Sequence, residues 1–139
     1  MEPDVAGLVG DVSRMSTLAG IVLDWRNAAA LARFWEVALG WRTRPYDEAE
    51  IARLATLGRT PATDPSVAVD APDGSLTLLL MEVPEPRTTK NRMHLDIRLR
   101  DDTHLNELVE LGATILAEHE HWLVLADPEG NEFCAEHPI

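Results

Sequence analysis

The sequence predicts an α+β domain in which two paired βαβββ modules form a curved mixed sheet with helices on the outside. Three observations lead to this fold class. The order strand, helix, strand, strand, strand occurs twice, and both helices end at a Leu-Gly pair, Leu39-Gly40 and Leu111-Gly112. A single unit of this kind cannot bury the apolar face of its sheet, so two copies are expected to pair. The 139 residues, 45% of them apolar, suffice for one such domain.

The first module is predicted to span residues 17–83, and its helix has the clearest signals. A β-branched run predicts a strand at Leu18–Trp25, after which Asn27 offers an N-cap. The helix is expected over Ala28–Leu39 and ends at Gly40. Its apolar residues recur at helical spacing and form one stripe, made of Leu31, Phe34, Trp35, Ala38 and Leu39.

The rest of this module is expected to hold three strands and a short helix. The helix is predicted at Ala49–Leu57, and the strands are predicted at Trp41–Tyr46, Ser66–Asp70 and Leu76–Val83. The segment 49–65 is either a lid over a cleft or an insertion. Residues 84–92 have the composition of a linker, and residues 1–16 form an N-terminal extension with no clear period.

The second module, residues 93–139, opens with a strictly alternating segment, Met93–Leu99. Alternation predicts a strand with two different faces. The apolar face carries Met93, Leu95, Ile97 and Leu99. The other face, directed to the cleft, carries His94, Asp96 and Arg98.

A second helix follows, capped by Asp101 or Asp102 and ended by Gly112. Its inward side chains are predicted to be Leu105, Leu108 and Val109. Three further strands are expected at Ala113–Ala117, Trp122–Ala126 and Asn131–Glu136.

Charge and composition limit the partners. Twelve Lys and Arg against twenty-four Asp and Glu leave a formal net charge of −12. Polyanions are bound by clustered cations, and no stretch supplies such a cluster, so neither nucleic acid nor a membrane is an expected partner. No apolar run reaches the ~20 residues of a membrane span, and the first residues lack a signal-peptide pattern. A single cysteine, Cys134, favours the cytoplasm.

Three stretches resemble the vicinal oxygen chelate superfamily of glyoxalase I, bleomycin-resistance proteins and extradiol dioxygenases, and above all its glyoxalase-like branch. They are GIVLDW with FWEVALGW in Gly20–Trp41, VPEPRTTKNRMHLDIRL in Val83–Leu99 and VLADPEGNEFC in Val124–Cys134. The resemblance implies paired βαβββ modules, a cleft formed by the curved sheet, and a homodimer. It does not imply one function, because the superfamily hosts lyases, isomerases, dioxygenases and binding proteins.

Metal-dependent members of the superfamily place a His on the first strand of each module and an acidic residue on the last. On this pattern His94 fits the second-module His. The first-module His position holds Gly20, and its acidic position holds Leu80 or Met81. The second acidic position holds Cys134. The resemblance therefore implies a degenerate site in which one of the four ligands is clearly retained.

A different ligand set stays open. Glu132 lies two residues before Cys134 and shares a strand face with it. The candidate metal ligands are thus His94, Glu132 and Cys134, with Asp24 as a further donor, and the ion would be zinc, nickel, manganese or iron. The alternative is that His94 hydrogen-bonds Asp96 or a neighbouring strand, the glutamates are solvated, and no cofactor is bound.

The candidate residues for binding a small organic ligand are His94, Asp96, Arg98, Trp122 and Asp24. Arg98 is expected either to pair with Asp96 or to hold a ligand carboxylate or phenolate. Trp122 either lies at the bottom of the pocket and stacks on a flat ligand, or packs against neighbouring side chains without a role in binding.

Cys134 and the pair His119 and His121 are better interpreted as structural residues than as a nucleophile and a metal site. The nearby glutamates disfavour the thiolate of Cys134, which opposes a role as nucleophile. His119 and His121 are two residues apart and resemble a metal clip, yet a solvated turn is the better interpretation of that stretch.

Three functional hypotheses follow. The first is a module that binds a small aromatic or polar organic molecule without metal, as in drug sequestration. The second is a lyase, isomerase or dioxygenase in which His94 and Glu132, or Cys134, hold a divalent ion while a carboxylate moves a proton. The third is a protein whose main activity is dimerisation. The missing first-module ligands favour the first hypothesis.

Overall fold

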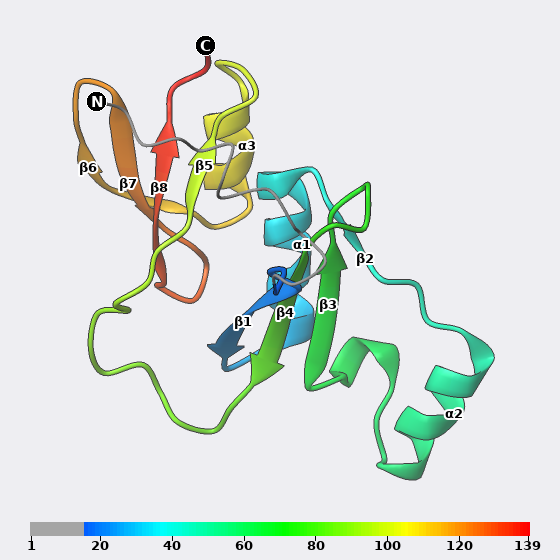
Figure 1. Cartoon of the computed structure of the whole chain (residues 1–139). Helices are drawn as coiled ribbons and strands as arrows, with labels where there is room; N and C mark the ends of the chain where they lie inside the picture. Colours follow the sequence, from blue (N-terminus) through cyan, green and yellow to red (C-terminus); the bar gives the residue numbers. More distant parts are fainter. Residues whose placement is uncertain (1–15) are drawn as a thin grey trace.

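The computed structural model describes residues 16–139 and contains the strand–helix–strand–strand–strand unit twice (Figure 1). The first module consists of β1 (Gly20–Trp25), α1 (Ala28–Leu39), β2 (Arg42–Thr43), β3 (Ser66–Asp70) and β4 (Thr77–Glu82). Between β2 and β3 lie α2 (Glu48–Thr56) and a 3-10 turn at Pro61–Thr63. The second module consists of β5 (Asp96–Arg98), α3 (His104–Glu110), β6 (Thr114–Glu118), β7 (Trp122–Ala126) and β8 (Glu132–Glu136). The duplicated α+β fold is confirmed.

Each module forms its own four-stranded mixed sheet with the same strand order. The two orders are β1-β4-β3-β2 and β5-β8-β7-β6. In both sheets the first and last strands of the module are parallel neighbours, and the remaining pairs are antiparallel. Within residues 16–139, β1 and β5 are edge strands with no ladder between them. Backbone hydrogen bonds therefore do not join the modules into one continuous sheet.

Helix α1 has the predicted bounds because both of its ends carry strong local signals. The Asn27 side chain accepts a hydrogen bond from the backbone N–H of Ala30 at 3.0 Å. Gly40 takes a φ of 69°, and its N–H donates to the Glu36 carbonyl at 2.8 Å. This left-handed conformation favours glycine. The predicted apolar stripe is also confirmed, since its residues are buried except for the half-buried Leu39.

The same helix packs against both modules. Phe34 and Trp35 of α1 contact Phe133 of β8, with ring centroids 5.9 and 5.1 Å apart in edge-on arrangements. All three side chains are at most 2% exposed. Buried aromatic side chains contribute strongly to core stability, because each removes a large apolar area from water. The two modules therefore share one core.

Polar contacts tie the turn before β8 to α1. The indole Nε1 of Trp35 donates to Asp127 Oδ2 at 3.3 Å, and the other oxygen of Asp127 accepts two backbone N–H groups of its own turn. The Glu129 carboxylate accepts the backbone N–H groups of Arg26 and Asn27 at 2.8 and 3.1 Å. The turn at residues 127–130, the DPEG turn, thus links the second module to the start and the middle of α1.

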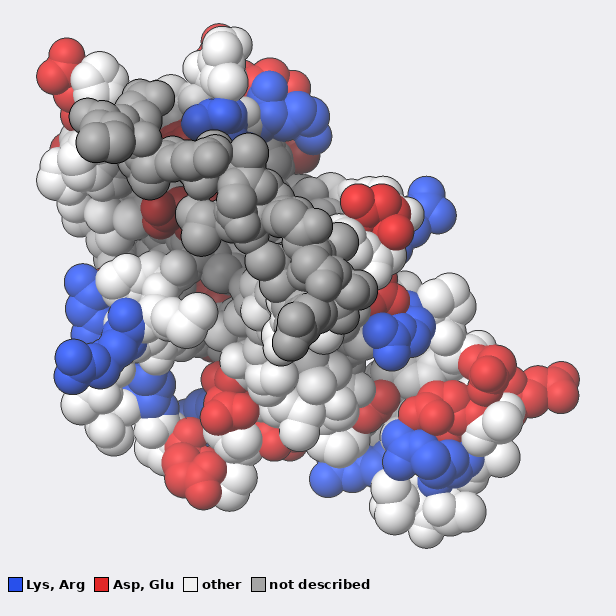
Figure 2. Space-filling model, viewed as in Figure 1, with Lys and Arg blue, Asp and Glu red and all other residues white. Residues whose placement is uncertain are grey.

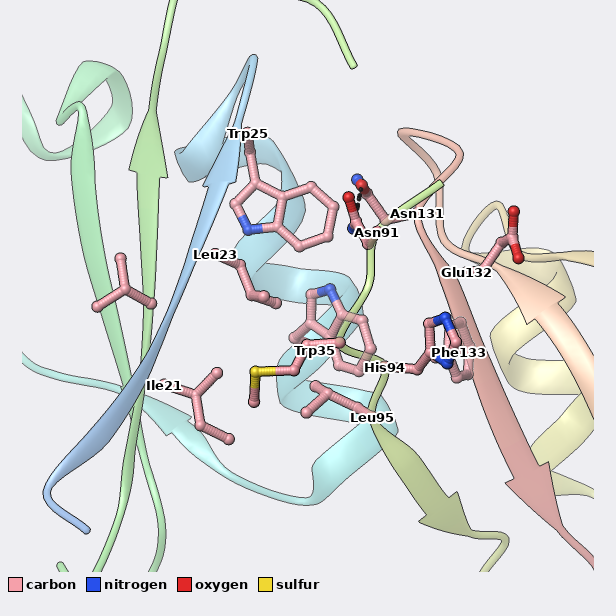
Figure 3. Close-up of a pocket in the computed structure, with 12 residues that line it drawn as sticks. Ile21, Leu23, Trp25, Trp35, Asn91, His94, Leu95, Asn131, Glu132 and Phe133 are labelled. Carbon is pink, nitrogen blue, oxygen red and sulfur yellow. Dashed lines mark hydrogen bonds between the residues drawn. The ribbon is translucent and has the colours of Figure 1, made fainter. Parts of the chain in front are cut away.

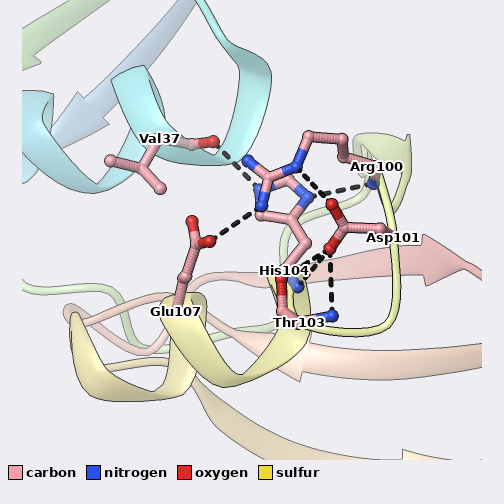
Figure 4. A network of polar contacts seen from close by, with 6 residues as sticks. All are labelled: Val37, Arg100, Asp101, Thr103, His104 and Glu107. Atoms are coloured by element: carbon pink, nitrogen blue, oxygen red, sulfur yellow. Dashed lines mark hydrogen bonds and ion pairs between the residues drawn. The ribbon is translucent and has the colours of Figure 1, made fainter.

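Buried His104 makes a third link between the modules (Figure 4). Its Nδ1 accepts the backbone N–H of Arg100 at 3.1 Å, and its Nε2 lies 3.0 Å from the Val37 carbonyl. Because Nδ1 accepts, Nε2 is the nitrogen that donates to the Val37 carbonyl. The N-cap residue of α3 is Thr103 and not Asp101 or Asp102 as predicted, although the carboxylate of Asp101 accepts the N–H groups of Thr103 and His104.

Some elements differ from the prediction. The strand predicted at Met93–Leu99 is limited to β5, because only three of its residues pair with β8 and no strand lies on its other side. Met93 is 74% exposed instead of facing the core. The strand predicted at Trp41–Tyr46 shortens to β2. On α3, Val109 is 42% exposed, and His104 takes the buried position instead.

The other elements begin and end within two residues of their predicted bounds. The predicted N-terminal extension, apart from Ser16, lies outside the described residues. Between residues 16 and 139, no helix is both long and apolar enough to cross a membrane.

The buried carboxyl of Asp127 predicts a pH-dependent stability. Burial raises its pKa to about 6, although the hydrogen bonds from Trp35 and from the turn oppose the shift. The unfolded chain releases this proton near pH ~3.9, so the folded state binds more protons between pH ~4 and ~6. The free energy of unfolding should therefore fall by about 3 kcal/mol, relative to Asp127→Asn, as the pH rises through this window. Urea denaturation at several pH values measures the difference. Asp102→Asn, at an exposed site, should parallel the wild type, and an identical pH profile for Asp127→Asn would contradict the assignment.

Candidate ligand-binding site

A hollow of about 90 Å³ lies between the two modules, with Trp35 of α1 in its lining. One wall comes from β1 and the other from the segment before β5 and the start of β8 (Figure 3). The lining is mainly apolar and includes Ile21, Leu23, Trp25, Trp35, Met93 and Phe133. Pockets for drug-sized ligands occupy roughly 300–1,000 Å³. The hollow is smaller than such pockets, so it has room for a ring-sized group and not for a whole drug-sized molecule.

The alternation of β1 explains why the hollow is apolar. Ile21, Leu23 and Trp25 are half-buried or buried, whereas Val22 and Asp24 between them are exposed. Successive side chains of a strand point to opposite faces, so the three apolar residues share one face. Because β5 does not pair with β1, part of this face borders the hollow and is not covered by a neighbouring strand.

Polar groups are confined to a few positions of the lining. Asn91 Nδ2 donates to Asn131 Oδ1 at 3.1 Å, so these two amides form a pair. His94 is exposed at the hollow, and Glu132 forms an ion pair with Lys90 at 3.4 Å. Lys90 belongs to the segment that joins β4 to β5, and Figure 2 shows Lys and Arg atoms over this part of the surface.

Two buried tryptophans border the hollow, and their indole N–H groups are in different situations. Nε1 of Trp35 donates to Asp127, as described above. Trp25 is 3% exposed, and its Nε1 is buried with no hydrogen-bond partner. Among the side-chain atoms of residues 16–139, it is the one buried polar atom in that state. In Figure 3 this nitrogen lies on the edge of the ring nearest Leu23 and Trp35.

The candidate metal ligands do not gather into a cluster. Within the described part of the chain, no three His, Cys, Asp or Glu side chains lie close enough together to hold a metal ion. His94 and Glu132 both border the hollow, but Glu132 is already paired with Lys90. Asp24 is exposed, lies on the face of β1 opposite to Ile21, Leu23 and Trp25, and does not line the hollow.

The first module has no donor at the matching positions. If Gly20 is the counterpart of His94, then Val22 is the counterpart of Asp96, since each lies two residues further along its strand. Val22 pairs with Leu79 in the first sheet, and Asp96 pairs with Cys134 in the second. Leu79 is therefore the counterpart of Cys134. Glycine and leucine side chains have no atom that binds a metal, so these two positions do not fit the ligand set that the resemblance implies.

The strand register also corrects the position inferred from the sequence. The sequence predicts Leu80 or Met81 at the first acidic position. Leu80 is fully buried and faces the core, so it cannot reach the open face of the sheet, whereas Met81 shares the face of Leu79 but lies two residues further along β4. The one-residue difference from Leu79 reverses the face, because the side-chain period of a strand is two residues.

Cys134 lies beside Asp96 on the open face of the second sheet, and the two residues pair across β5 and β8. Burial raises the pKa of the Cys134 thiol, and the charge of Asp96 and its hydrogen bond to the thiol raise it further. Glu132 acts in the same direction, while Lys90 opposes the shift. The thiolate is therefore disfavoured, as expected from the sequence, although Asp96 contributes more than the glutamates.

Arg98 and Trp122 do not make the contacts that the sequence predicted for them, which were an ion pair with Asp96 and a place in the pocket. Arg98 Nη2 lies 2.6 Å from Glu136 Oε2, which makes Glu136 its partner in place of Asp96. Trp122 is 41% exposed and stacks on His119, with ring centroids 4.6 Å apart. Neither residue lines the hollow. His119 and His121 are exposed at the β6–β7 turn, in agreement with a solvated turn.

The segment between β2 and β3 forms one side of a second, polar depression on the first module. Tyr46 donates its hydroxyl to the buried carboxylate of Asp64 at 2.7 Å, and Arg53 pairs with Glu50 on α2. These polar groups border the open face of β3 together with Arg44. Since each of them has a partner within the segment, the depression offers a ligand less than the apolar hollow does.

The sequence pattern of the glyoxalase-like domain family matches residues 20–135, which include every strand of both modules but the last residue of β8. The chain belongs to the glyoxalase-like domain family. It is thereby a member of the vicinal oxygen chelate superfamily, as the sequence resemblance implied. A comparison with curated proteins found no match.

Solved structures support the same fold for this glyoxalase-like protein. A glyoxalase/bleomycin resistance protein/dioxygenase family enzyme from Burkholderia phytofirmans PsJN has a TM-score of 0.57 at 17% identity, over 89% of this chain and 100% of that one. A glyoxalase/dioxygenase from Nostoc punctiforme has 0.58 at 16% identity, over 91% and 94%. TioX from Micromonospora sp. ML1 has 0.55 at 14% identity, over 89% and 100%. At these identities the likeness concerns the fold.

Sequence reasoning missed several residues that shape the site. Trp25 was not singled out, although its parity with Ile21 and Leu23 already indicated an inward position. Asn91 and Asn131 carried no signal, because they are forty residues apart and meet only in the folded chain. The roles of Asp127 and Glu129 in holding α1 were likewise hidden within a turn motif.

The environment of Cys134 predicts slow alkylation that depends on Asp96. Since the pKa of the thiol is raised, the rate of reaction with iodoacetamide should rise with pH to a midpoint above the usual ~8.5. Asp96→Asn removes the negative charge, lowers the pKa and should accelerate alkylation at pH 8 by about two- to tenfold. Because Cys134 is the single cysteine, mass spectrometry reports this site alone. Asp24→Asn is the control, and equal rates for both variants would contradict the assignment.

Proposed function

We propose that this glyoxalase-like protein binds a small organic molecule in the hollow between its modules, without a resident metal ion. The observation that carries the proposal is the chemistry of the hollow, which is lined mainly by aliphatic and aromatic side chains with a few polar groups. Small-molecule sites generally combine an apolar lining with a small number of polar anchors. Binding without turnover is what sequestration of a ligand or antibiotic requires.

The surroundings of the hollow also support binding over metal-dependent catalysis. Gly20 and Leu79 supply no donor atoms, and the thiol of Cys134 holds its proton more firmly because burial and the charge of Asp96 raise its pKa. A metal–thiolate bond requires loss of that proton, which these surroundings oppose. The competing interpretation, a lyase, isomerase or dioxygenase, depends on an ion held by His94 and Glu132.

A ligand in the hollow would also contact exposed apolar side chains beside it. Val22 is 59% exposed and Met93 is 74% exposed, and both belong to the lining. A ring-sized group inside the hollow would leave the rest of a larger molecule in contact with these two residues. The homodimer and the cytoplasmic location remain predictions from the resemblance and the composition.

Metal analysis separates the two functions. Protein purified without chelator should contain well below one zinc, nickel, manganese or iron ion per chain, and His94→Ala should leave this content unchanged. The reason is that the matching first-module positions offer no donor atoms. Elemental analysis by mass spectrometry gives the stoichiometry. One ion per chain, lost on His94→Ala, would overturn the proposal in favour of a metal-dependent enzyme.

Filling the hollow should abolish ligand binding. A panel of small aromatic compounds is screened for a rise in melting temperature, since a ligand at 100 times its Kd stabilises the folded state by about 2.7 kcal/mol. Leu23→Trp inserts a bulky side chain into the hollow and should eliminate the shift for every hit. Trp122→Ala, on the open face of the second sheet, should preserve it. If Trp122→Ala removes the shift and Leu23→Trp preserves it, the ligand site lies on the open face.

A further inference from the structure

The free edge of β1 carries main-chain hydrogen-bonding groups that no neighbouring strand uses. On the other side of β1, the carbonyls of Ala19 and Trp25 accept N–H groups at the two ends of the parallel ladder with β4. A strand directs the main-chain groups of successive residues to alternate sides, so the odd-numbered residues of β1 bond to β4. The N–H and the C=O of Val22 therefore point to the free edge, where no strand of residues 16–139 lies.

The hollow lies directly beside this edge (Figure 3). Its lining includes the consecutive residues Ile21, Val22 and Leu23, whose side chains alternate between the two faces of β1, so the hollow reaches the edge itself. The opposite wall is the segment before β5, which does not pair with β1. Val22 is 59% exposed. The main chain of Val22 is therefore open to a molecule that lies between the two modules.

An extended peptide fits both the edge and the hollow. When a strand adds antiparallel to an edge, one of its residues exchanges two N–H···O bonds with the residue opposite. A residue paired with Val22 directs its own side chain to the open face, as Val22 does. Its chain neighbours direct theirs to the inner face, beside Ile21 and Leu23, where the hollow lies. A hollow of about 90 Å³ has room for one such side chain.

We propose that the hollow and the free edge of β1 together bind a short extended peptide, in which one residue pairs with the main chain of Val22 and a neighbouring apolar side chain fills the hollow. This inference rests on the function proposed above and narrows the ligand class to molecules with an amide chain. The main-chain bonds contribute affinity for any sequence, and the hollow selects the side chain. The net charge of −12 favours peptides whose ends are uncharged or basic.

A peptide and its ester analogue test one of the two main-chain bonds in the wild-type protein. In N-acetylglycylphenylalanine N-methylamide, the glycine pairs with Val22 and the phenyl ring enters the hollow. The analogue carries an ester oxygen in place of the glycine N–H and keeps the shape. Dissociation constants from ligand-observed NMR should show about tenfold tighter binding of the peptide, because the analogue has no hydrogen for the Val22 carbonyl. Equal constants would refute the pairing.

Val22→Pro tests the other bond without removing a ladder bond to β4. Proline has no N–H, and an edge strand tolerates it where the N–H points away from the neighbouring strand. This variant should bind the peptide about tenfold more weakly than the wild type. Asp24→Pro is the matched control, because Asp24 lies on the same edge outside the lining of the hollow, and it should leave the affinity unchanged. An equal loss in both variants would overturn the assignment to Val22.

Amide hydrogen exchange tests the open edge directly. In the free protein, the N–H of Val22 should exchange much faster than that of Leu23, which belongs to the ladder with β4, and the peptide should slow it. Protection of Val22 that grows with protein concentration in the absence of peptide would show pairing with a second copy. Protection at every concentration would show that the edge is already paired within the chain. Either result would overturn the proposal.

The outcomes separate this inference from the proposed function. If the peptide and its ester analogue bind equally and Leu23→Trp blocks both, the main-chain pairing is refuted and the hollow remains the ligand site. If neither binds but a compound of the aromatic panel does, peptides are excluded and the proposed function stands. If no compound binds at all, the proposed function fails as well.

Discussion

The burial of one face of α1 against both modules is the constraint on which the rest of the structure depends. Trp35 packs edge-on against Phe133 of the second module, and its indole nitrogen donates to Asp127. The carboxylate of Glu129 and the imidazole of His104 hold the two ends of the same helix. Apolar burial supplies most of the free energy of this packing, whereas the hydrogen bonds are directional and add geometric specificity.

This arrangement places the two edge strands near each other without joining them. β1 and β5 are separate edges, and Ile21, Leu23 and Trp25 of β1 line the hollow together with Trp35 of α1. The hollow is the space that results. Its lining comes from β1, from Trp35 of α1, from the segment before β5 and from the start of β8, so it exists only when both modules are in place.

The two candidate surfaces of the protein differ in how far their polar groups are already satisfied. On the open face of the second sheet, Arg98 pairs with Glu136, and Cys134 is the cross-strand neighbour of Asp96. Next to the hollow, the buried indole N–H of Trp25 has no partner among the described residues. The polar pairs on the open face must be broken before these side chains can bind a ligand, whereas the apolar lining of the hollow has no such cost.

The sequence by itself determined the elements whose signals are local. Asn27, the apolar stripe and Gly40 defined α1, and the repeated element order with the ADPEGNEFC motif indicated the duplicated fold, because capping, helical periodicity and turn chemistry act over a few residues. The tertiary structure alone decided which open edges remain, that Arg98 meets Glu136, and that Trp25 lies unpaired at a hollow. These features depend on contacts between residues far apart in the chain, and on a strand register in which a shift of one residue reverses the face of every side chain.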